Sequence, residues 1–338
     1  MLKIEKSRLS ELFASISGEM ALYVPTEKNG SSEFALWEET AVPALDILNT
    51  AKPAKQLFFP QSETIVSFKT SGKNIEIFEQ AKSDAPFAVY GVRACDACSI
   101  EKVLDRVFLA DPVDEFYKAR RENGIIITAA CGEPEETCFC GTFGIDAADC
   151  RYGDVTTWTV GEDVYFDANT DKGAQFLGKF STLLTDADSG AVDGFKENAR
   201  AIFAQLPLAE LSLENWGEGK TDEKFNSEKW EELSSSCIGC GTCTFVCPTC
   251  QCYDIRDYDT GHGVQRYRCW DSCMYSDFTL MAHGNSRKSQ VERFRQRFMH
   301  KLVYFPDNND GMFSCVGCGR CLAKCPVSMN IVKVIKNI

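Results

Sequence analysis

Histidine is scarce in this sequence, with only His262, His283 and His300 among 338 residues. Any metal site must therefore take most of its ligands from other side chains. Long apolar runs are missing too, since none approaches the roughly 18 residues that a membrane span requires, so we expect no membrane-spanning segment. Positive charge is also in deficit. The formal net charge of −13 argues against a general affinity for nucleic acid or anionic lipid.

Several nucleotide-binding and catalytic motifs are absent as well. No G-x-G-x-x-G follows an expected strand, and no P-loop, G-x-S-x-G or H-E-x-x-H occurs. The residue patterns therefore indicate no site for a nicotinamide, a flavin or ATP. The first residues, MLKIEKSRLSELF, carry charges where a signal peptide would have its apolar stretch. We expect a cytoplasmic protein.

Cysteine, in contrast, is abundant and unevenly distributed. Of the 18 cysteines, none precedes Cys95, six lie between Cys95 and Cys150, and twelve lie from Cys237 onward. Persistent disulfides are rare in a reducing cytoplasm, so such a density of cysteine usually indicates metal. Sites built from thiolates favour iron–sulfur clusters, zinc or copper(I).

One cysteine motif occurs twice, as CIGCGTCTFVCP at Cys237–Pro248 and as CVGCGRCLAKCP at Cys315–Pro326. In C-x2-C-x2-C-x3-C-P, three thiolates bind one cubane and the fourth binds the other cluster of the pair. The repeat therefore predicts two 4Fe-4S clusters. The predicted ligands of one are Cys237, Cys240, Cys243 and Cys325, and those of the other are Cys315, Cys318, Cys321 and Cys247.

The alternative to two clusters is a pair of zinc knuckles or a four-cysteine zinc ribbon. Zinc sites use C-x2-C pairs but have no use for three evenly spaced cysteines and a fourth before proline. The motif glycines are expected to let the backbone approach the sulfides. They are Gly239, Gly241, Gly317 and Gly319.

The first half of the chain has the pattern of a mixed α and β domain. The apolar runs PFAVYGVR (86–93) and GIIITAAC (124–131) predict strands, and the residues between them have helical spacing. This βαβ-like unit predicts parallel neighbouring strands with Cys95 and Cys131 just beyond their carboxyl ends, where open α/β sheets place ligands. Asp96 is expected to cap the first helix. Residues 154–168 predict a β-hairpin that turns at Gly161.

Two domains are expected. Residues 1–220 would form an α+β (α/β-like) domain, and residues 221–338 an all-helical ferredoxin-type domain with two clusters. The polar stretch 214–226 is the expected linker. Sixty-eight positions separate Cys247 from Cys315 (315 − 247), and the order of motifs resembles the helical ferredoxin modules of multisubunit reductases. That resemblance implies a largely helical insertion.

The first half also offers a third metal site. Its five neighbouring thiols are one more than a cluster needs, and they are Cys95, Cys98, Cys131, Cys138 and Cys140. Cys95 and Cys98 look like a pair by spacing, although Cys98 begins a helix and can point elsewhere. A zinc site and unligated buried thiols are the alternatives, since free cysteine often behaves as a small buried hydrophobe.

The chain resembles a known family at several stretches, namely GVRACD, DRVF, RREN, C-x6-CFC, CPTCQC, RYRCWDSC, HGNSR, RQRFMHK and the last cysteine motif. This family contains the beta subunits of soluble NiFe sulfhydrogenases and one of the iron–sulfur subunits of anaerobic sulfite reductase. The resemblance extends from about Lys55 to the C-terminus. It implies a third 4Fe-4S cluster bound by Cys95, Cys131, Cys138 and Cys140. Cys98 is then the extra thiol, because this chain has GVRACDA where the family has GVRPCDL, and Cys150 is expected to be unligated.

The resemblance also implies a function. The chain would be the non-catalytic electron-transfer subunit of a cytoplasmic, hetero-oligomeric oxidoreductase complex from an anaerobe. It would relay electrons between a catalytic partner and an FAD- and NAD(P)-binding subunit. The catalytic partner would be a hydrogenase, a sulfite reductase or a heterodisulfide reductase-like assembly. Two alternatives stay open. One is a binding or regulatory protein that carries clusters or zinc without relaying electrons, and the other is a flavin or small substrate held against the cluster of the first domain.

The insertion between the two motifs carries further cysteines, Cys250, Cys252, Cys269 and Cys273. Either Cys252, Cys273 and His283 form another metal site, or these thiols line the cluster cavity as polarizable apolar groups. Their spacing is not diagnostic, which favours the second interpretation.

A basic segment follows in the same insertion. Residues 286–301 contain six basic residues against Glu292, and Arg293, Arg297, His300 and Lys301 share one helical face. This face can be a solvated edge, a docking site for an acidic partner, or charge compensation for anionic clusters. A nucleic-acid surface is the weakest interpretation, given the acidic remainder.

Overall fold

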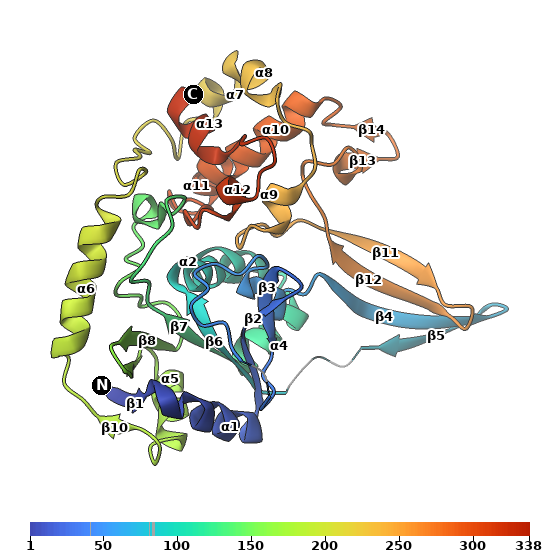
Figure 1. Cartoon of the computed structure of the whole chain (residues 1–338). Helices are drawn as coiled ribbons and strands as arrows, with labels where there is room; N and C mark the ends of the chain where they lie inside the picture. The colour runs from blue at the N-terminus through green and yellow to red at the C-terminus, as the bar shows by residue number, and fades with distance from the viewer. Residues whose placement is uncertain (41, 81, 83–84) are drawn as a thin grey trace.

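A computed structural model of the chain describes residues 1–40, 42–80, 82 and 85–338. The N-terminal part is built on an eight-stranded mixed sheet (Figure 1). Its strands are β1 (Leu2–Glu5), β2 (Ala21–Lys28), β3 (Ser31–Leu36), β6 (Phe87–Arg93), β7 (Gly124–Ala129), β8 (Val155–Val160), β9 (Asp163–Ala168) and β10 (Thr185–Asp186). Its helices are η1 (Lys6–Arg8), α1 (Leu9–Glu19), η2 (Ala54–Leu57), α2 (Ala94–Cys98), η3 (Ser99–Leu104), α3 (Asp105–Phe108), α4 (Glu115–Asn123), η4 (Cys140–Phe143), α5 (Asp171–Lys179) and α6 (Gly190–Phe203).

The centre of the sheet is parallel and its margins are antiparallel. The strand order is β10-β1-β9-β8-β7-β6-β2-β3, and β2, β6, β7 and β8 run parallel to their neighbours within that group. Parallel strands are normally covered on both faces. In β6, Ala88 and Tyr90 pack into the core with α1 and α5, whereas Phe87 and Val89 pack into the core with α2 to α4. The two-residue period of the strand thus separates two cores.

The predicted βαβ unit is confirmed. β6 pairs parallel with β7, and the helical segments α2 to α4 connect them. The hairpin of β8 and β9 is also confirmed, with Gly161 at a φ of 57° in its turn. The capping role of Asp96 is wrong, because Arg93 holds the N-cap position of α2 and Asp96 lies buried inside the helix. Its carboxylate pairs with Arg320 instead.

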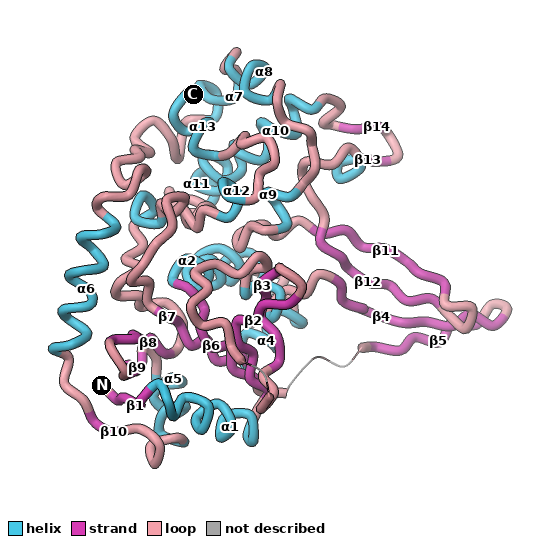
Figure 2. The backbone as a smooth tube through the Cα atoms, in the orientation of Figure 1, coloured by secondary structure: helices cyan, strands magenta, loops and turns pink. Residues whose placement is uncertain are grey.

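The C-terminal part contains mostly short helices (Figure 2). They are α7 (Thr221–Phe225), α8 (Lys229–Ser234), α9 (Thr242–Phe245), η5 (Asp277–Thr279), α10 (Gln290–Met299), η6 (His300–Tyr304), α11 (Phe305–Asn308), α12 (Arg320–Ala323) and α13 (Ile331–Asn337). Trp230 of α8, Phe294 and Phe298 of α10, and Ile335 of α13 share one core. Ser289 and Glu292 form a capping box that starts α10.

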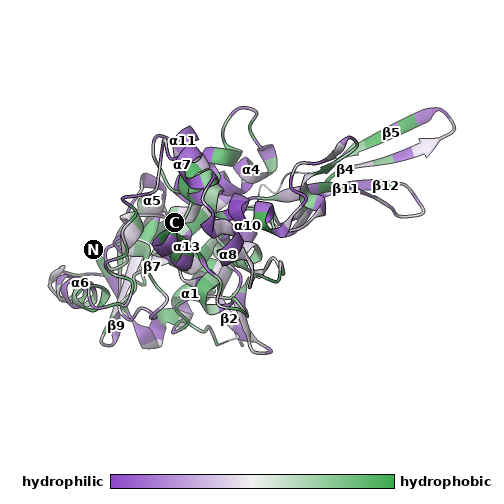
Figure 3. Ribbon diagram, turned by 90° about the horizontal axis from the view of Figure 1, so that it is seen from above, coloured by the Kyte–Doolittle hydropathy of each residue, from purple (hydrophilic) through white to green (hydrophobic). Residues whose placement is uncertain are grey.

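The expectation of a largely helical insertion is wrong for residues 253–270. There β11 (Tyr253–Asp259) and β12 (Val264–Trp270) form a hairpin, which pairs with β4 (Ser62–Ser71) and β5 (Asn74–Glu79) in a separate four-stranded sheet. This sheet projects away from the rest of the molecule (Figure 3). The short strands β13 (Leu280–Met281) and β14 (Gly284–Asn285) form a third sheet. Because β4 precedes residue 220 and β12 follows it, strand pairing crosses the proposed domain boundary, which stays a prediction.

The fold class is confirmed in its main features, a mixed α and β N-terminal part with a large sheet and a C-terminal region that holds the repeated motif. Among the described residues, no helix combines the length and the apolar character needed to cross a membrane.

Candidate metal centres

The two copies of the repeated motif adopt the same local backbone. In each, the glycine before the third cysteine is left-handed, Gly241 at a φ of 74° and Gly319 at 77°, and a short helix, α9 or α12, starts directly after it. The third cysteine, Cys243 or Cys321, is the second residue of that helix. The internal repeat seen in the sequence is therefore also a structural repeat.

The four thiols predicted for one cluster lie around a single pocket. Cys315, Cys318 and Cys321 of the second motif and Cys247 of the first all line it. Cys247 thus leaves its own motif and joins the other, as the crossed ligand pattern of such pairs requires. The Cys250 thiol donates a hydrogen bond to the Cys247 sulfur, and this bond lowers the pKa of Cys247. The thiolate, which is the metal-binding form, is favoured there.

The other C-terminal set is less completely assembled. Cys237 and Cys243 pack against the core of α8, α10 and α13, while Cys240 is exposed. Gln290 Nε2 donates to Cys237 Sγ at 3.4 Å. Cys325 Sγ accepts from Met329 N at 3.2 Å, so its hydrogen bonding is local. Its assignment beside the first motif stays a prediction.

The four thiols predicted for the N-terminal cluster also line one pocket. Cys95 follows β6 and Cys131 follows β7, at the carboxyl ends of two parallel strands. Cys138 and Cys140 come from the loop after β7, where Phe139 N donates to Gly317 O at 2.9 Å. That bond holds the loop against the second motif. Consequently Cys318 lines both four-cysteine pockets.

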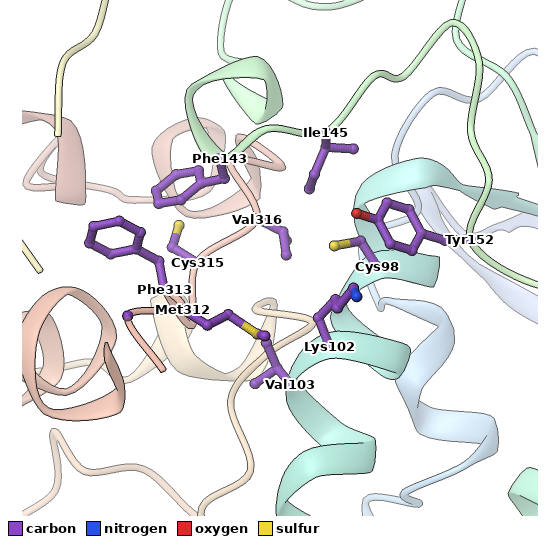
Figure 4. Close-up of a pocket in the computed structure, with 11 residues that line it drawn as sticks. Cys98, Lys102, Val103, Phe143, Ile145, Tyr152, Met312, Phe313, Cys315 and Val316 are labelled. Carbon is purple, nitrogen blue, oxygen red and sulfur yellow. The ribbon is translucent and has the colours of Figure 1, made fainter. Parts of the chain in front are cut away.

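Two other cysteines of the first half lie outside this pocket. Cys98 lines a neighbouring apolar pocket together with Tyr152 and Cys315 (Figure 4). The Cys150 thiol donates to Tyr152 O at 3.6 Å. Burial raises the pKa of Cys98 to about 11 and that of Cys150 to about 12. Cys140 and Cys315 have similarly raised pKa values, so it is position that sets Cys98 and Cys150 apart, because neither lines a pocket of four predicted ligands.

The donor sets suit the cationic iron–sulfur core of a cluster. Burial, together with the nearby charges of Cys131 and Cys138, raises the pKa of Cys140 to about 12. Burial likewise raises the pKa of Cys315 to about 12. Thiolates crowded in this way need positive charge, which bound iron supplies. In the described chain, no three His, Cys, Asp or Glu side chains are placed to bind one metal ion together. That finding concerns a mononuclear site, whereas the four thiolates of a cubane bind four different irons.

Close backbone approach at the second motif explains two of its glycines. A Cβ on Gly319 would lie 2.7 Å from Thr137 O, and a Cβ on Gly317 would overlap the carbonyl of Phe139. Both residues also have positive φ, at 77° and 60°, which side-chain-bearing residues rarely adopt. Glycine therefore lets the loop of the N-terminal site pack directly onto the second motif.

Two residues of the basic segment turn inward instead of facing water. Arg297 and Lys301 are 3% and 4% exposed and line the pocket of Cys247. Burial alone would lower the pKa of Lys301, but the negative charge of the nearby cysteine sulfurs, that of Cys247 first, raises it above its ordinary value. A solvated edge is therefore wrong for these two residues, and the contacts favour charge compensation.

A third buried cation was missed by the sequence interpretation. Lys55 is 2% exposed, its Nζ donates to Cys250 O at 2.6 Å, and it lies 4.0 Å from the centre of a Trp270 ring. Burial lowers the pKa of Lys55 to about 8. No local motif marks Lys55, because Cys250 lies 195 positions away in the chain.

The remaining cysteines of the insertion do not assemble with His283. Cys252 and Cys273 flank the hairpin of β11 and β12, and the hydrogen bond from the Cys273 thiol lowers the pKa of Cys252 to about 7. Cys269 lies on β12 opposite Asp254. His283 is exposed in the turn between β13 and β14. The contacts thus join two thiols of the suggested trio and leave the histidine at the surface.

Comparisons with known proteins agree with this geometry. Residues 236–329 match the family described as the 4Fe-4S dicluster domain. Over 340 aligned residues the chain is 30% identical to Sulfhydrogenase 2 subunit beta of Pyrococcus furiosus, and the match covers 99% of this chain and 97% of that protein. The aligned length thus spans the N-terminal sheet as well as the repeated motifs. The chain belongs to the family of sulfhydrogenase beta subunits.

Proposed function

We propose that this chain is an iron–sulfur electron-transfer subunit that holds three 4Fe-4S clusters. When bound, such clusters exchange single electrons at potentials that their surroundings adjust. The observation that carries the proposal is the position of Cys318, which lines both four-cysteine pockets. Two cluster sites whose pockets are lined by the same residue are close enough to pass an electron between them.

The ligands in this proposal are the twelve cysteines of the predicted sets. Cys95, Cys131, Cys138 and Cys140 hold the N-terminal cluster. Cys247, Cys315, Cys318 and Cys321 hold the middle one. Cys237, Cys240, Cys243 and Cys325 hold the third. Helix α9, which carries Cys243, packs against α12, which carries Cys321, so in this proposal the three sites form a row with the Cys318 site in the middle.

Other residues of the chain prepare these sites. Arg297 and Lys301 offset the negative charge of thiolates at the middle site. Apolar side chains cover part of the first motif, where Trp230, Met274 and Phe298 form the core that Cys237 and Cys243 contact. A dry, cationic surrounding changes the potential of a cluster and shields it from solvent.

The proposed partners are a catalytic redox subunit, together with an FAD- and NAD(P)-binding subunit, in one cytoplasmic complex of an anaerobe. The name of the Pyrococcus relative, which describes one subunit, supports a multisubunit assembly. Purification from anaerobically grown cells should retain flavin and a larger redox chain with this protein. A stable chain that purifies alone, with no redox partner, contradicts this part of the proposal.

Metal analysis tests the clusters themselves. Three cubanes predict about twelve irons and as many sulfides per chain in oxygen-free material. Replacing one ligand in Cys95→Ala should remove about four irons. Cys98→Ala, three positions away in the same helical region, is the matched control and should retain them all. Zinc as the main metal supports a binding or regulatory protein instead, and iron loss in Cys98→Ala contradicts the ligand assignment.

A second candidate function is favoured by the apolar pocket of Figure 4. Phe143, Phe313 and Tyr152 give it aromatic walls, Lys102 supplies a cation, and Cys315 of the middle site is exposed to it. Such a pocket could hold a flavin or another small aromatic molecule against the cluster. A yellow chromophore on the isolated chain would decide for this candidate, and a colour due only to iron and sulfide would decide against it.

A further inference from the structure

A buried ion pair lies between the N-terminal and middle cysteine sites. Asp96 directly follows Cys95 in α2, and Arg320 directly precedes Cys321 in α12. Arg320 Nη1 and Nη2 donate to Asp96 Oδ1 and Oδ2 at 2.5 and 2.8 Å. The two residues are only 1% and 3% exposed. This two-pronged bond between a guanidinium and a carboxylate fixes both distance and orientation.

The surroundings of the pair restrict it further. Arg320 Nε donates to Thr50 O at 2.7 Å, and Ala54 N donates to Asp96 Oδ2 at 3.4 Å. The same connecting segment contacts the cysteine sites, because Asn49 Nδ2 donates to Cys318 O at 3.2 Å. The ion pair therefore ties α2, residues 49–54 and α12 into one rigid junction between the two sites.

Stability alone does not explain such a pair. Removing both charges from water is costly, and well-packed apolar replacements of a buried pair are often as stable or more stable. Its position suggests another role. Both charges lie beside ligands of both sites, because Asp96 directly follows Cys95, Arg320 lies two residues after Cys318, and the ion pair joins the two residues. The same charges would act on a cluster bound by these thiols.

We propose that Asp96 and Arg320 are positioning residues for electron transfer, which hold the N-terminal and middle clusters in fixed relation and set the reduction potentials of both. This inference rests on the proposed function. Adding an electron to a cluster adds negative charge, so a nearby cation favours reduction and a nearby anion opposes it. In the low-dielectric interior, the ion pair has a stronger effect than exposed charges at the same distance.

Redox titration monitored by EPR tests the inference on the full chain prepared without oxygen. Asp96→Asn removes the anion and should make both neighbouring clusters easier to reduce, by at least a tenfold change in the equilibrium, which is about 59 mV for one electron. Arg320→Gln should shift both in the opposite direction. In the double variant the shifts should largely offset each other. The cluster of Cys237, Cys240 and Cys243 lies furthest from the pair and serves as an internal reference.

A matched control separates charge from structure. Glu63 and Arg268 form another buried ion pair, with Arg268 Nη2 at 2.6 Å from Glu63, and it joins β4 to β12. Glu63→Gln makes the same charge change at a buried carboxylate, which here pairs with Arg120 as well as Arg268, and should leave all the potentials unchanged. Equal shifts in Asp96→Asn and Glu63→Gln, or unchanged potentials in Asp96→Asn with full iron content, would overturn the inference.

Arg320→Lys provides a second route if either single variant loses iron. This variant keeps the cation and loses the two-pronged bond. Its reduction potentials should therefore shift less from the wild-type values than those of a variant without the cation, such as Arg320→Gln. A shift to lower potential as large as that of Arg320→Gln overturns the assignment to charge. The iron content of the unmodified chain tests the proposed function separately, because a wild-type chain without clusters fails before any potential is compared.

Discussion

At the scale of single residues, the protonation of partly buried His300 links the stability of the C-terminal part to pH. His300 starts η6, and its ring lies 6.3 Å from that of Phe305. Burial lowers the pKa of His300 to about 4, and the positive charges of Lys301 and Arg287 add to this effect. In the unfolded chain a histidine titrates near its ordinary pKa of about 6.5. Between these values the unfolded state binds the extra proton, so the free energy of unfolding falls as pH decreases.

We therefore predict that His300→Phe makes the chain more resistant to acid. Relative to wild type, the free energy of unfolding of the variant should rise as pH falls from 7 to 4.5, by at most roughly 3 kcal/mol. Urea unfolding at several pH values measures this difference. His283→Phe is the control, because an exposed side chain meets similar solvent in both states. A pH-independent difference for His300→Phe would refute the prediction.

At the scale of elements, the turn that starts α12 depends on Gly319. We predict that Gly319→Ala weakens both the middle and the N-terminal sites. A left-handed conformation costs a residue with a side chain about 1–2 kcal/mol, and the new Cβ would also strike Thr137 at 2.6 to 2.7 Å. Because Thr137 directly precedes Cys138, moving it displaces a predicted ligand. Iron content and thermal unfolding should both fall.

Gly141→Ala is the matched control for this prediction. Gly141 lies in the same loop beside Cys140, but no atom lies within 4 Å of a Cβ placed on it. Its replacement should leave iron content near that of wild type. Equal loss of iron in both variants would show that the loop tolerates no added methyl group, and the specific role of the α12 turn would be refuted.

The elements that the sequence predicted correctly are those whose pattern is local. β6 and β7 are continuous apolar runs, and the residues between them form helices as their spacing predicted. The hairpin of β11 and β12 was missed because its partner, β4, lies almost 200 positions earlier in the chain. Its strands are also mixed in polarity and mostly exposed. Neither the two-residue period nor an apolar run marked them as strands.

In the candidate site, too, the residues with a local sequence pattern were predicted and those that depend on distant contacts were not. Regular spacing identified the cysteines of the repeated motifs, and the resemblance supplied the choice of Cys95 over Cys98. The charged residues around them were harder to predict. Asp96 was predicted to be a helix cap, and the role of Lys301 was left open between a solvated edge, a docking site and charge compensation, because their partners Arg320 and Cys247 come from other parts of the chain. Burial of a charge depends on tertiary contacts that no local period encodes.

At the scale of the whole molecule, the order of the proposed cluster sites determines the path of electron transfer. In the proposed row, Cys318 of the middle site also lines the N-terminal pocket, and α12, which carries Cys321, packs against α9, which carries Cys243 of the remaining site. We predict that Cys321→Ala, which removes a ligand of the middle cluster alone, interrupts the row. In the purified complex, electron flow between the partner subunits should fall by more than about a hundredfold, as expected if the only short path is lost. Dithionite should still reduce the two outer clusters, because small reductants reach each site independently. Iron analysis should show about eight irons per chain, which means that only the middle cluster has been lost. A lower iron content would indicate a general loss of clusters. Undiminished flow with the middle cluster absent would mean that electrons enter and leave through one outer site, and the linear order would then be wrong.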